Sequence, residues 1–294
     1  MKIGIVVPQG WTGEYAGLPP DLAWARTRAV ATQAEALGFE SIWLFDHFHT
    51  VPEPTDELTF ESFTSLSALA ALTTRVRLGH VVICSGYRNP ALVAKMAGTL
   101  DVISGGRFEI GIGAGWKEDE WRAYGYGYPP LRDRLAHLDE SVQVLDLMLR
   151  PGHADFSGRF VNVADAINLP KGLQSPRIPI MVGGNGPNVT WRIAARHADE
   201  LNLDALSPDE TRAALPVIAS RCEEVDRDPA TLRISVHMNW PDAARGGERR
   251  RETLAAYRDL GVARVMVFLR RATKGDEALE SLAEDVRGIG LALA

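Results

Sequence analysis

Short apolar runs and longer amphipathic segments alternate along the whole chain. The short runs are rich in β-branched residues, which is typical of buried strands. The longer segments repeat their apolar residues every three or four positions, which is typical of helices that bury one face. Eight strands are expected, at residues 3–7, 41–45, 76–84, 108–112, 178–182, 200–203, 232–237 and 264–268.

The segments between these strands carry signals for the start and end of helices. Asp21 can cap a helix that ends before Gly38, and Ser207 followed by Pro208 is a typical helix start. Pro90 suits the first turn of another helix. Helices are expected at residues 21–37, 61–72, 90–103, 131–149 and 188–197, from residue 208, and at residues 248–260 and 277–289.

Strict alternation of strands and helices indicates parallel strands joined by crossover helices. Eight such units in 294 residues fit an α/β fold of the (β/α)8 TIM-barrel type better than a doubly wound sheet. A doubly wound sheet would carry a glycine-rich dinucleotide fingerprint after its first strand, and residues 8–13 lack it. Residues 1–294 are therefore interpreted as a single barrel domain with loop insertions after strands 1 and 4 and before strand 5. The last insertion, at 151–176, shows little regular pattern.

Composition and charge exclude several classes of partner. The net charge of −6 and the pI of about 5.7 argue against nucleic acid and acidic membrane surfaces, which attract basic patches. No window of about 18 apolar residues exists to span a membrane. The N-terminal apolar run is too short for a signal peptide. Cys84 and Cys222 form no CxxC pattern, so a cytoplasmic location is expected, and Cys84 is interpreted as a buried apolar residue.

Active sites of (β/α)8 barrels lie in the loops after the carboxyl ends of the strands. Asp46 and His47 follow the second expected strand. A histidine at this place can exchange a proton near neutral pH, and a neighbouring carboxylate can orient it. Side chains alternate along a strand, so only one of the two is expected to face inward. The alternative is that Asp46 caps a turn and His47 packs beneath the loop.

A metal site is a second interpretation of the same segment. Asp46, His47 and His49 could act as ligands of a metal-dependent barrel hydrolase. Metal sites in barrels usually draw ligands from several strands, and only His80 and His237 lie near other strand ends. The metal interpretation is therefore the weaker one, and no metal ligand is assigned.

Glycines mark two further strand ends. Gly183, Gly184, Asn185 and Gly186 precede a helix, where free backbone N–H groups and the helix dipole can bind an anion such as phosphate. A plain glycine-rich turn without a ligand is the alternative. The other glycine-rich loop, at residues 111–115, leaves the fourth strand and indicates a close approach of the backbone to another group.

Aromatic residues gather after the fourth strand. They can cover a flat ring system, or they can form the small core of an inserted loop, and the second interpretation is favoured for most of them. Three other tryptophans, Trp11, Trp43 and Trp240, are interpreted as packing residues, although Trp11 could face the site. The residues after the fourth strand are Trp116, Trp121, Tyr124, Tyr126 and Tyr128.

Short motifs follow one another in a fixed order over most of residues 1–205. They include LGFESIW at 37–43, YRNPAL at 87–92, LDVISGGR at 100–107, GIGAGW at 111–116 and IMVGG at 180–184. Each motif is modest alone. The ordered set resembles the luciferase-like monooxygenase superfamily, the bacterial-luciferase fold group of flavin-dependent and coenzyme-F420-dependent oxidoreductases. After residue 206 the resemblance rests on the continuing α/β rhythm.

The resemblance implies a barrel whose mouth holds a deazaflavin (coenzyme F420) or a flavin (FMN). It implies that Asp46 and His47 lie beside the ring, with His47 exchanging a proton, and that Gly183 and Gly184 bind the cofactor phosphate. It also implies a non-proline cis peptide near His80–Val81, a small-molecule substrate and a homodimer. The expected catalytic residues are His47 and Asp46. The expected cofactor-binding residues are Asp46, His80, Val81, Gly113, Ala114, Gly115, Gly183, Gly184 and Asn185.

The sequence also departs from parts of the family. His80 stands where many relatives have a serine or threonine. Trp116 and approximately Val51 stand where the sugar-phosphate dehydrogenases of the family have a glutamate and a tryptophan, which argues against a sugar-phosphate substrate.

We expect hydride transfer between F420 and a small organic substrate. An FMN-dependent monooxygenase that activates O₂ is the alternative within the fold. The metal-dependent hydrolase and a barrel that binds a ligand without turnover are the alternatives outside that chemistry.

Overall fold

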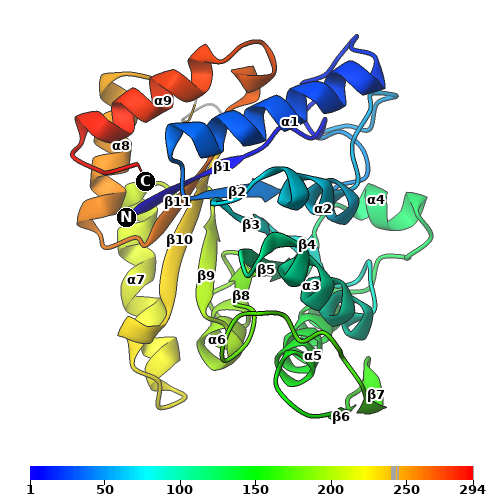
Figure 1. Cartoon of the computed structure of the whole chain (residues 1–294). Helices are drawn as coiled ribbons and strands as arrows, with labels where there is room; N and C mark the ends of the chain where they lie inside the picture. The colour runs from blue at the N-terminus through cyan, green and yellow to red at the C-terminus, as the bar shows by residue number, and fades with distance from the viewer. Residues whose placement is uncertain (240–242, 244, 294) are drawn as a thin grey trace.

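The computed structural model describes residues 1–239, 243 and 245–293, so the predicted packing of Trp240 lies outside the described residues. Its main sheet is a closed ring of parallel strands, in the order β3-β2-β1-β11-β10-β9-β8-β5-β4, with β3 also paired to β5 (Figure 1). The predicted (β/α)8 barrel is confirmed. The strands of the ring are β1 (Lys2–Val6), β2 (Ser41–Leu44), β3 (Arg77–His80), β4 (Ile83–Cys84), β5 (Phe108–Gly113), β8 (Ile180–Gly183), β9 (Glu200–Asp204), β10 (Arg233–Met238) and β11 (Arg264–Phe268).

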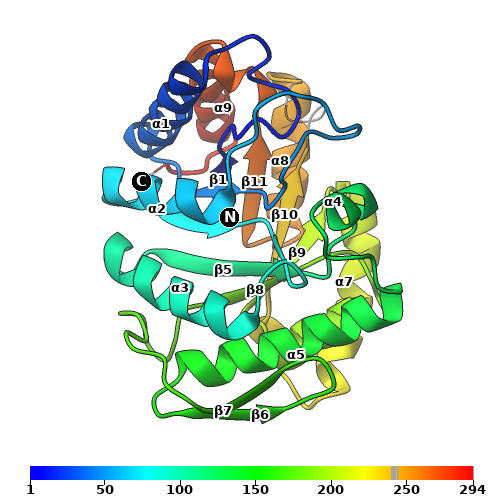
Figure 2. The same ribbon diagram turned by 90° about the vertical axis from the view of Figure 1, so that its right-hand side faces the viewer.

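Helices surround the ring of strands on the outside (Figures 1 and 2). The crossover helices agree with the predicted ones to within one residue, except at α6, which starts two residues later. The short helix α4, inside the insertion after β5, was not predicted. Among the described residues, no helix is long and apolar enough to cross a membrane. The helices are α1 (Pro20–Leu37), α2 (Ser62–Leu72), α3 (Pro90–Ser104), α4 (Glu118–Ala123), α5 (Leu131–Leu149), α6 (Thr190–His197), α7 (Pro208–Glu223), α8 (Glu248–Asp259) and α9 (Glu277–Gly288), with 3₁₀ turns at Pro229–Thr231 and Arg270–Thr273.

Two segments differ from the sequence prediction. The third strand, expected to be continuous over residues 76–84, is divided into β3 and β4, and the peptide bond between Val81 and Val82 is cis. The insertion at 151–176 contains an antiparallel hairpin of β6 (Ala154–Ser157) and β7 (Asn162–Ala166), beside α5 (Figure 2). Its strands bury little apolar surface, so they carry almost none of the alternation by which a strand is recognised.

The residues that face into the barrel form layers, because side chains alternate along each strand. The layer at the closed end of the barrel, opposite the carboxyl ends of the strands, is charged. Arg264, 5 % exposed, donates two hydrogen bonds of 2.9 and 3.0 Å to the Glu109 carboxylate and one of 3.0 Å to Glu40. Burial alone would raise the pKa of Glu109, but the charges of Arg264 and Arg77 lower it to about 2. Glu109 is therefore ionised and paired at neutral pH.

Trp43 fills the middle of the barrel. Its ring is fully buried, lies over the Arg264 guanidinium at 5.0 Å, and donates a 2.8 Å hydrogen bond from Nε1 to Ser41 Oγ. Glycines on the flanking strands make room for it. A Cβ atom at Gly79 would lie 2.8 Å from Trp43 Cε3, and one at Gly4 would lie 2.8 Å from Trp43 Nε1. Packed interiors do not accept such contacts without displacement.

His80 faces the opposite way, into the layer between strands and helices. Its ring lies 4.3 Å from the Phe63 ring of α2 and 5.9 Å from the Phe108 ring, and it is fully buried. Neither ring nitrogen has a hydrogen-bond partner among the described residues. Burial lowers the pKa of His80 from 6.5 to about 4, although the charge of Asp46 acts in the opposite direction. His80 is thus a neutral core residue at physiological pH.

We expect Gly79→Ala to destabilise the fold by about 1–3 kcal/mol, because the new methyl group overpacks against Trp43. Urea unfolding of the purified chain measures the loss. In a Trp43→Leu background the same substitution should cost less, because the contact with Trp43 is absent and only that with the Glu109 carbonyl oxygen, 2.9 Å from the new Cβ atom, remains. An equal cost in both backgrounds would contradict this origin of the loss.

We also expect His80 to destabilise the fold in acid. Between pH 6.5 and 4 the unfolded chain binds a proton at this residue and the folded chain does not, so stability falls as the pH falls. Between pH 7.5 and 4.5 the free energy of unfolding, measured with urea, should therefore fall by about 2–3 kcal/mol less in His80→Leu than in wild type. The exposed His153→Leu is the matched control. An equal fall of the unfolding free energy in wild type and His80→Leu would show that His80 does not destabilise the fold in acid.

Candidate active site

The loops at the carboxyl ends of the strands meet at one face of the barrel, called the mouth below. The uppermost inward-facing residues are Phe45, Val81 and Phe268, which cluster with buried methionines beneath them. Trp11, from the loop after β1, packs against this cluster, with its ring 4.2 Å from the Phe45 ring. The floor of the mouth is therefore apolar and aromatic, as expected for a site that receives a flat organic ring.

His47 lies at the mouth between two tryptophans. The Trp11 ring stacks on it with centroids 5.0 Å apart and an angle of 13°, and the Trp116 ring meets it edge-on at 5.8 Å. The side chain keeps 12 % of its surface exposed. The structure thus places His47 where the sequence predicted, and its ring is fixed rather than free to rotate.

The partner of His47 is Glu120, which the sequence analysis did not identify. His47 Nδ1 lies 2.9 and 3.1 Å from the two oxygens of the Glu120 carboxylate, whose side chain is fully buried. The same carboxylate accepts hydrogen bonds of 3.0 Å from the Phe48 amide and 3.1 Å from Tyr87 Oη. Glu120 is one of three consecutive acidic residues on α4, and no sequence pattern distinguishes the one that turns inward.

This arrangement fixes how the His47 ring is used. A carboxylate only accepts hydrogen bonds, so Nδ1 is the donor and carries a proton. The other nitrogen, Nε2, is then the one that can take up or give away a proton at the mouth.

Asp46 points away from His47, as alternation along a strand requires. Its carboxylate accepts hydrogen bonds from Arg88 (2.7 and 2.9 Å), Ser62 Oγ (2.9 Å) and the Cys84 amide (2.9 Å). Burial alone would raise the pKa of Asp46, but Arg88 and the Cys84 amide hold it below its ordinary value. Both oxygens are occupied, so a ligand could contact Asp46 only by displacing one of these donors.

His80 and Val81 separate in the structure. The His80 side chain lies behind the barrel wall, so only the backbone at this position can face the mouth. Val81 belongs to the floor of the mouth. Val81 can therefore contact a cofactor bound in the mouth, whereas the His80 ring cannot.

The glycines after β5 are required by packing around the mouth. A Cβ atom at Gly113 would lie 2.8 Å from Val82 Cγ2, and one at Gly115 would lie 2.9 Å from Trp121 Nε1. Gly115 also adopts a φ of +73°, which favours glycine. Ala114, between them, packs against the main core and is partly exposed.

The glycine-rich loop after β8 is tied to the next strand. The Gly184 amide donates to the Asn202 carbonyl at 3.0 Å, and the Asn185 side chain bridges to the Asp204 backbone with two hydrogen bonds of 2.8 Å. Gly183 lies against Val82 at the end of β8. No side chain caps the start of α6, which leaves the geometry that binds anions at helix N-termini. The Asn185 side chain itself is engaged within the loop.

A second histidine stands on the opposite wall of the mouth. His237 Nε2 lies 3.0 Å from Asp204 Oδ1, and Nδ1 lies 3.2 Å from Asn202 Oδ1. The hydrogen bond from His237 lowers the pKa of Asp204, against the effect of burial. The rings of His47 and His237 lie 6.3 and 6.1 Å from the Phe45 ring. From the sequence, only the position of His237 near a strand end could be predicted.

The aromatic side chains predicted after the fourth strand have two different surroundings. Trp121, 4 % exposed, packs on Tyr126 and Tyr128 and also on Tyr87 from the segment after β4, while Tyr124 packs on Phe48. Trp116 is 62 % exposed and faces His47 instead. Among the described residues, no group of three or more His, Cys, Asp or Glu side chains is arranged to hold a metal ion.

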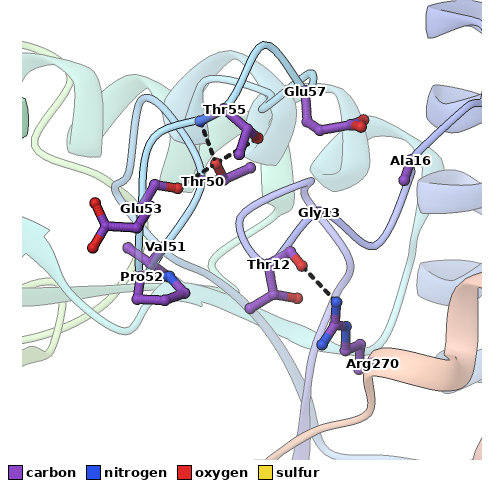
Figure 3. Close-up of a pocket in the computed structure, with 10 residues that line it drawn as sticks. All are labelled: Thr12, Gly13, Ala16, Thr50, Val51, Pro52, Glu53, Thr55, Glu57 and Arg270. Carbon is purple, nitrogen blue, oxygen red and sulfur yellow. Dashed lines mark hydrogen bonds between the residues drawn. The ribbon is translucent and has the colours of Figure 1, made fainter.

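A cavity of about 250 Å³ lies beside the mouth, between the loops after β1 and β2 and the segment after β11 (Figure 3). Arg270 donates a 2.9 Å hydrogen bond to the Thr12 carbonyl across its edge. Thr50 Oγ1 donates to the Glu53 carbonyl on the other side. The loop that carries Trp11 is thereby linked to the end of β11.

Solved structures share the fold over the whole length. An F420-dependent secondary alcohol dehydrogenase, in complex with an F420-acetone adduct, matches with a TM-score of 0.80 and 17% identity, over 98% of both chains. The coenzyme F420 dependent tetrahydromethanopterin reductase of Methanopyrus kandleri matches with a TM-score of 0.76 and 19% identity, again over 98% of both chains. At these identities the likeness shows the fold alone.

Curated relatives match part of the chain. The F420-dependent glucose-6-phosphate dehydrogenase of Kineococcus radiotolerans is 35% identical over 170 residues, which are 58% of this chain and 49% of the relative. The pyrimidine monooxygenase RutA of a Bradyrhizobium species is 32% identical over 212 residues, which are 68% of this chain and 56% of the relative. The matches thus span about half the length of these relatives.

The model of one protein family, described as luciferase-like monooxygenase, matches residues 1–288. This match covers nearly the whole chain and includes the ends of all the barrel strands. Its relatives include F420-dependent dehydrogenases and monooxygenases, in agreement with the resemblance of the sequence motifs. The chain belongs to the luciferase-like monooxygenase family.

Proposed function

We propose that this chain is an oxidoreductase that binds coenzyme F420 in the mouth of its barrel and transfers a hydride between the cofactor and a small organic substrate. His47 takes up or releases the accompanying proton at Nε2. The observation that carries the proposal is the His47–Glu120 hydrogen bond, which aims a single proton-exchanging nitrogen into an aromatic mouth.

The residues of the mouth fit a flat, tricyclic cofactor ring. Its floor is made of Phe45, Val81 and Phe268, and aromatic side chains stand on its walls. Trp11 Nε1 is buried and has no hydrogen-bond partner among the described residues, so a ring oxygen or nitrogen of a ligand can satisfy it. The uncapped start of α6, next to Gly183 and Gly184, suits the cofactor phosphate.

The chain's own part in the reaction is positioning and proton transfer. A bound deazaflavin or flavin supplies the ring position that accepts or donates a hydride. Glu120 holds the His47 ring in one orientation and tautomer, and the Phe48 amide and Tyr87 Oη hold Glu120. Trp11 and Trp116 limit the access of water to Nε2, which favours transfer to the substrate.

A flavin-dependent monooxygenase is the second candidate. The relatives named as monooxygenases support it, including RutA at 32% identity. Reduced flavin reacts readily with O₂ and reduced deazaflavin does not, so oxygen consumption by the loaded enzyme distinguishes the two. The metal-dependent hydrolase has little support, because Asp46 is engaged by Arg88 and cannot join His47 and His49 around one ion.

The position of Trp116 indicates which kind of substrate the mouth accepts. It occupies the place where the sequence analysis expects a glutamate in sugar-phosphate dehydrogenases, and its exposed ring covers His47. We therefore propose a small, largely apolar substrate rather than a sugar phosphate. The homodimer implied by the family resemblance and the cytoplasmic location expected from the cysteines stay predictions, and light scattering of the purified chain would test the first.

We expect oxidised F420 to bind the purified chain more tightly than FMN, with fluorescence titration as the measurement. Trp11→Leu should weaken binding about tenfold, because it removes an aromatic wall worth about 1–1.5 kcal/mol beside the ring. Trp24→Leu, on the outer helix α1, is the matched control and should leave binding unchanged. Tighter binding of FMN would promote the monooxygenase candidate, and binding of neither would refute both.

We expect Glu120→Gln to lower turnover about 100-fold and to change the cofactor Kd less than threefold, because an amide can also donate hydrogen bonds and no longer fixes one tautomer of His47. Glu118→Gln, on the exposed side of the same helix, is the matched control. Equal losses of binding and turnover would contradict the role of Glu120.

A further inference from the structure

A second cavity, of about 330 Å³, lies at the rim of the barrel beyond the mouth. It is enclosed by the 3₁₀ turn Arg270–Thr273 after β11 and by the first turns of α8 and α9. We call it the basic pocket. Neither the His47 site nor the loop after β8 contributes to it.

The basic pocket has a charge opposite to that of the chain. Its lining carries four cations, Arg250, Arg270, Arg271 and Lys274, against one carboxylate, Glu277. The whole chain has a net charge of −6. Cations gathered in a concave site attract anions more strongly than scattered surface charges do.

The cations differ in how they are engaged. Arg250 is 3 % exposed and fixed by Asp285 (Nε–Oδ2 2.7 Å) and Ser281 Oγ (2.9 Å), so it forms a rigid wall. The Arg271 and Lys274 side chains, both exposed, make no hydrogen bond or ion pair with any residue of the described chain. Two neighbouring cations without partners repel each other, and an anion between them removes that cost.

Backbone groups at the start of α9 point to the same kind of ligand. The residues Glu277 and Ala278 of the first turn of α9 line the basic pocket, and no side chain caps this helix. The start of α8 is different, because the Asp285 carboxylate accepts a 2.9 Å hydrogen bond from the Gly247 amide there. The partial positive charge of a helix N-terminus adds to that of the cations, although the Glu277 carboxylate acts against them.

We infer that the basic pocket binds a small organic anion through a phosphate or carboxylate group. A volume of about 330 Å³ stands at the lower end of ligand sites, so the pocket accepts a molecule larger than a bare ion and smaller than a dinucleotide. Arg270 lines this pocket and also holds the Thr12 carbonyl of the loop that carries Trp11. An anion bound here therefore acts on the loop that covers His47.

Calorimetric titration of the whole chain with inorganic phosphate, and separately with glutarate, tests the proposal. We expect millimolar or tighter binding by wild type. Arg271→Glu and Lys274→Glu should each weaken it at least tenfold. Arg249→Glu changes the net charge equally on the same helix as Arg250 but lies outside the pocket, so it should change binding less than twofold.

The same titration on chain saturated with cofactor separates the pocket from the loop after β8. Binding heat that persists on the saturated chain and is lost in Arg271→Glu assigns the anion to an effector that is separate from the cofactor. Heat that the cofactor abolishes, together with weaker cofactor binding by Arg271→Glu, assigns it to the cofactor's own anionic part. Unchanged binding by both Arg271→Glu and Lys274→Glu, or no binding by wild type, overturns the proposal. None of these results depends on turnover, so the proposed hydride transfer stands or falls separately.

Discussion

The ion pair between Arg264 and Glu109 is the interaction on which the interior of this barrel depends. Both side chains point inward at the closed end of the barrel, where water cannot solvate them, and removing one partner of such a pair costs about 3–5 kcal/mol. The Arg264 guanidinium supports the Trp43 ring above it, and glycines on the flanking strands leave room for that ring. The aromatic floor of the mouth packs on Trp43, which lies over Arg264. These two residues therefore determine how far His47 lies from the closed end of the barrel.

The alternation of side chains along β2 then separates two neighbouring polar residues. His47 continues the inward series of Trp43 and Phe45 and reaches the mouth. Asp46 turns outward and binds Arg88, which fixes the end of the strand to the segment after β4. One carboxylate thus holds the loop in place, while a different carboxylate, Glu120, holds the imidazole. Asp46 thus has a structural role and Glu120 orients the histidine, and the sequence alone does not show which carboxylate has which role.

Much of the fold could be predicted from the sequence, because buried strands and amphipathic helices leave periodic patterns. The barrel, the strand ends and the place of His47 follow from those patterns. Glu120 could not be found in this way, because α4 is one short helix with three acidic residues in succession. The direction of the His80 ring depends on where the third strand is interrupted, which its apolar run does not reveal. The hairpin at β6 and β7 buries too little apolar surface to leave a pattern.

Glu120 does not belong to the barrel. It comes from the insertion after β5, whose Trp121 and Tyr126 rings pack against Tyr87 from the segment after β4. The insertion is therefore attached to the barrel at the place where it holds the histidine. Exchange of this one segment between related barrels would alter the orientation of the histidine and the shape of its cover together. New reactions could arise from this fold by such replacement while every strand stays as it is.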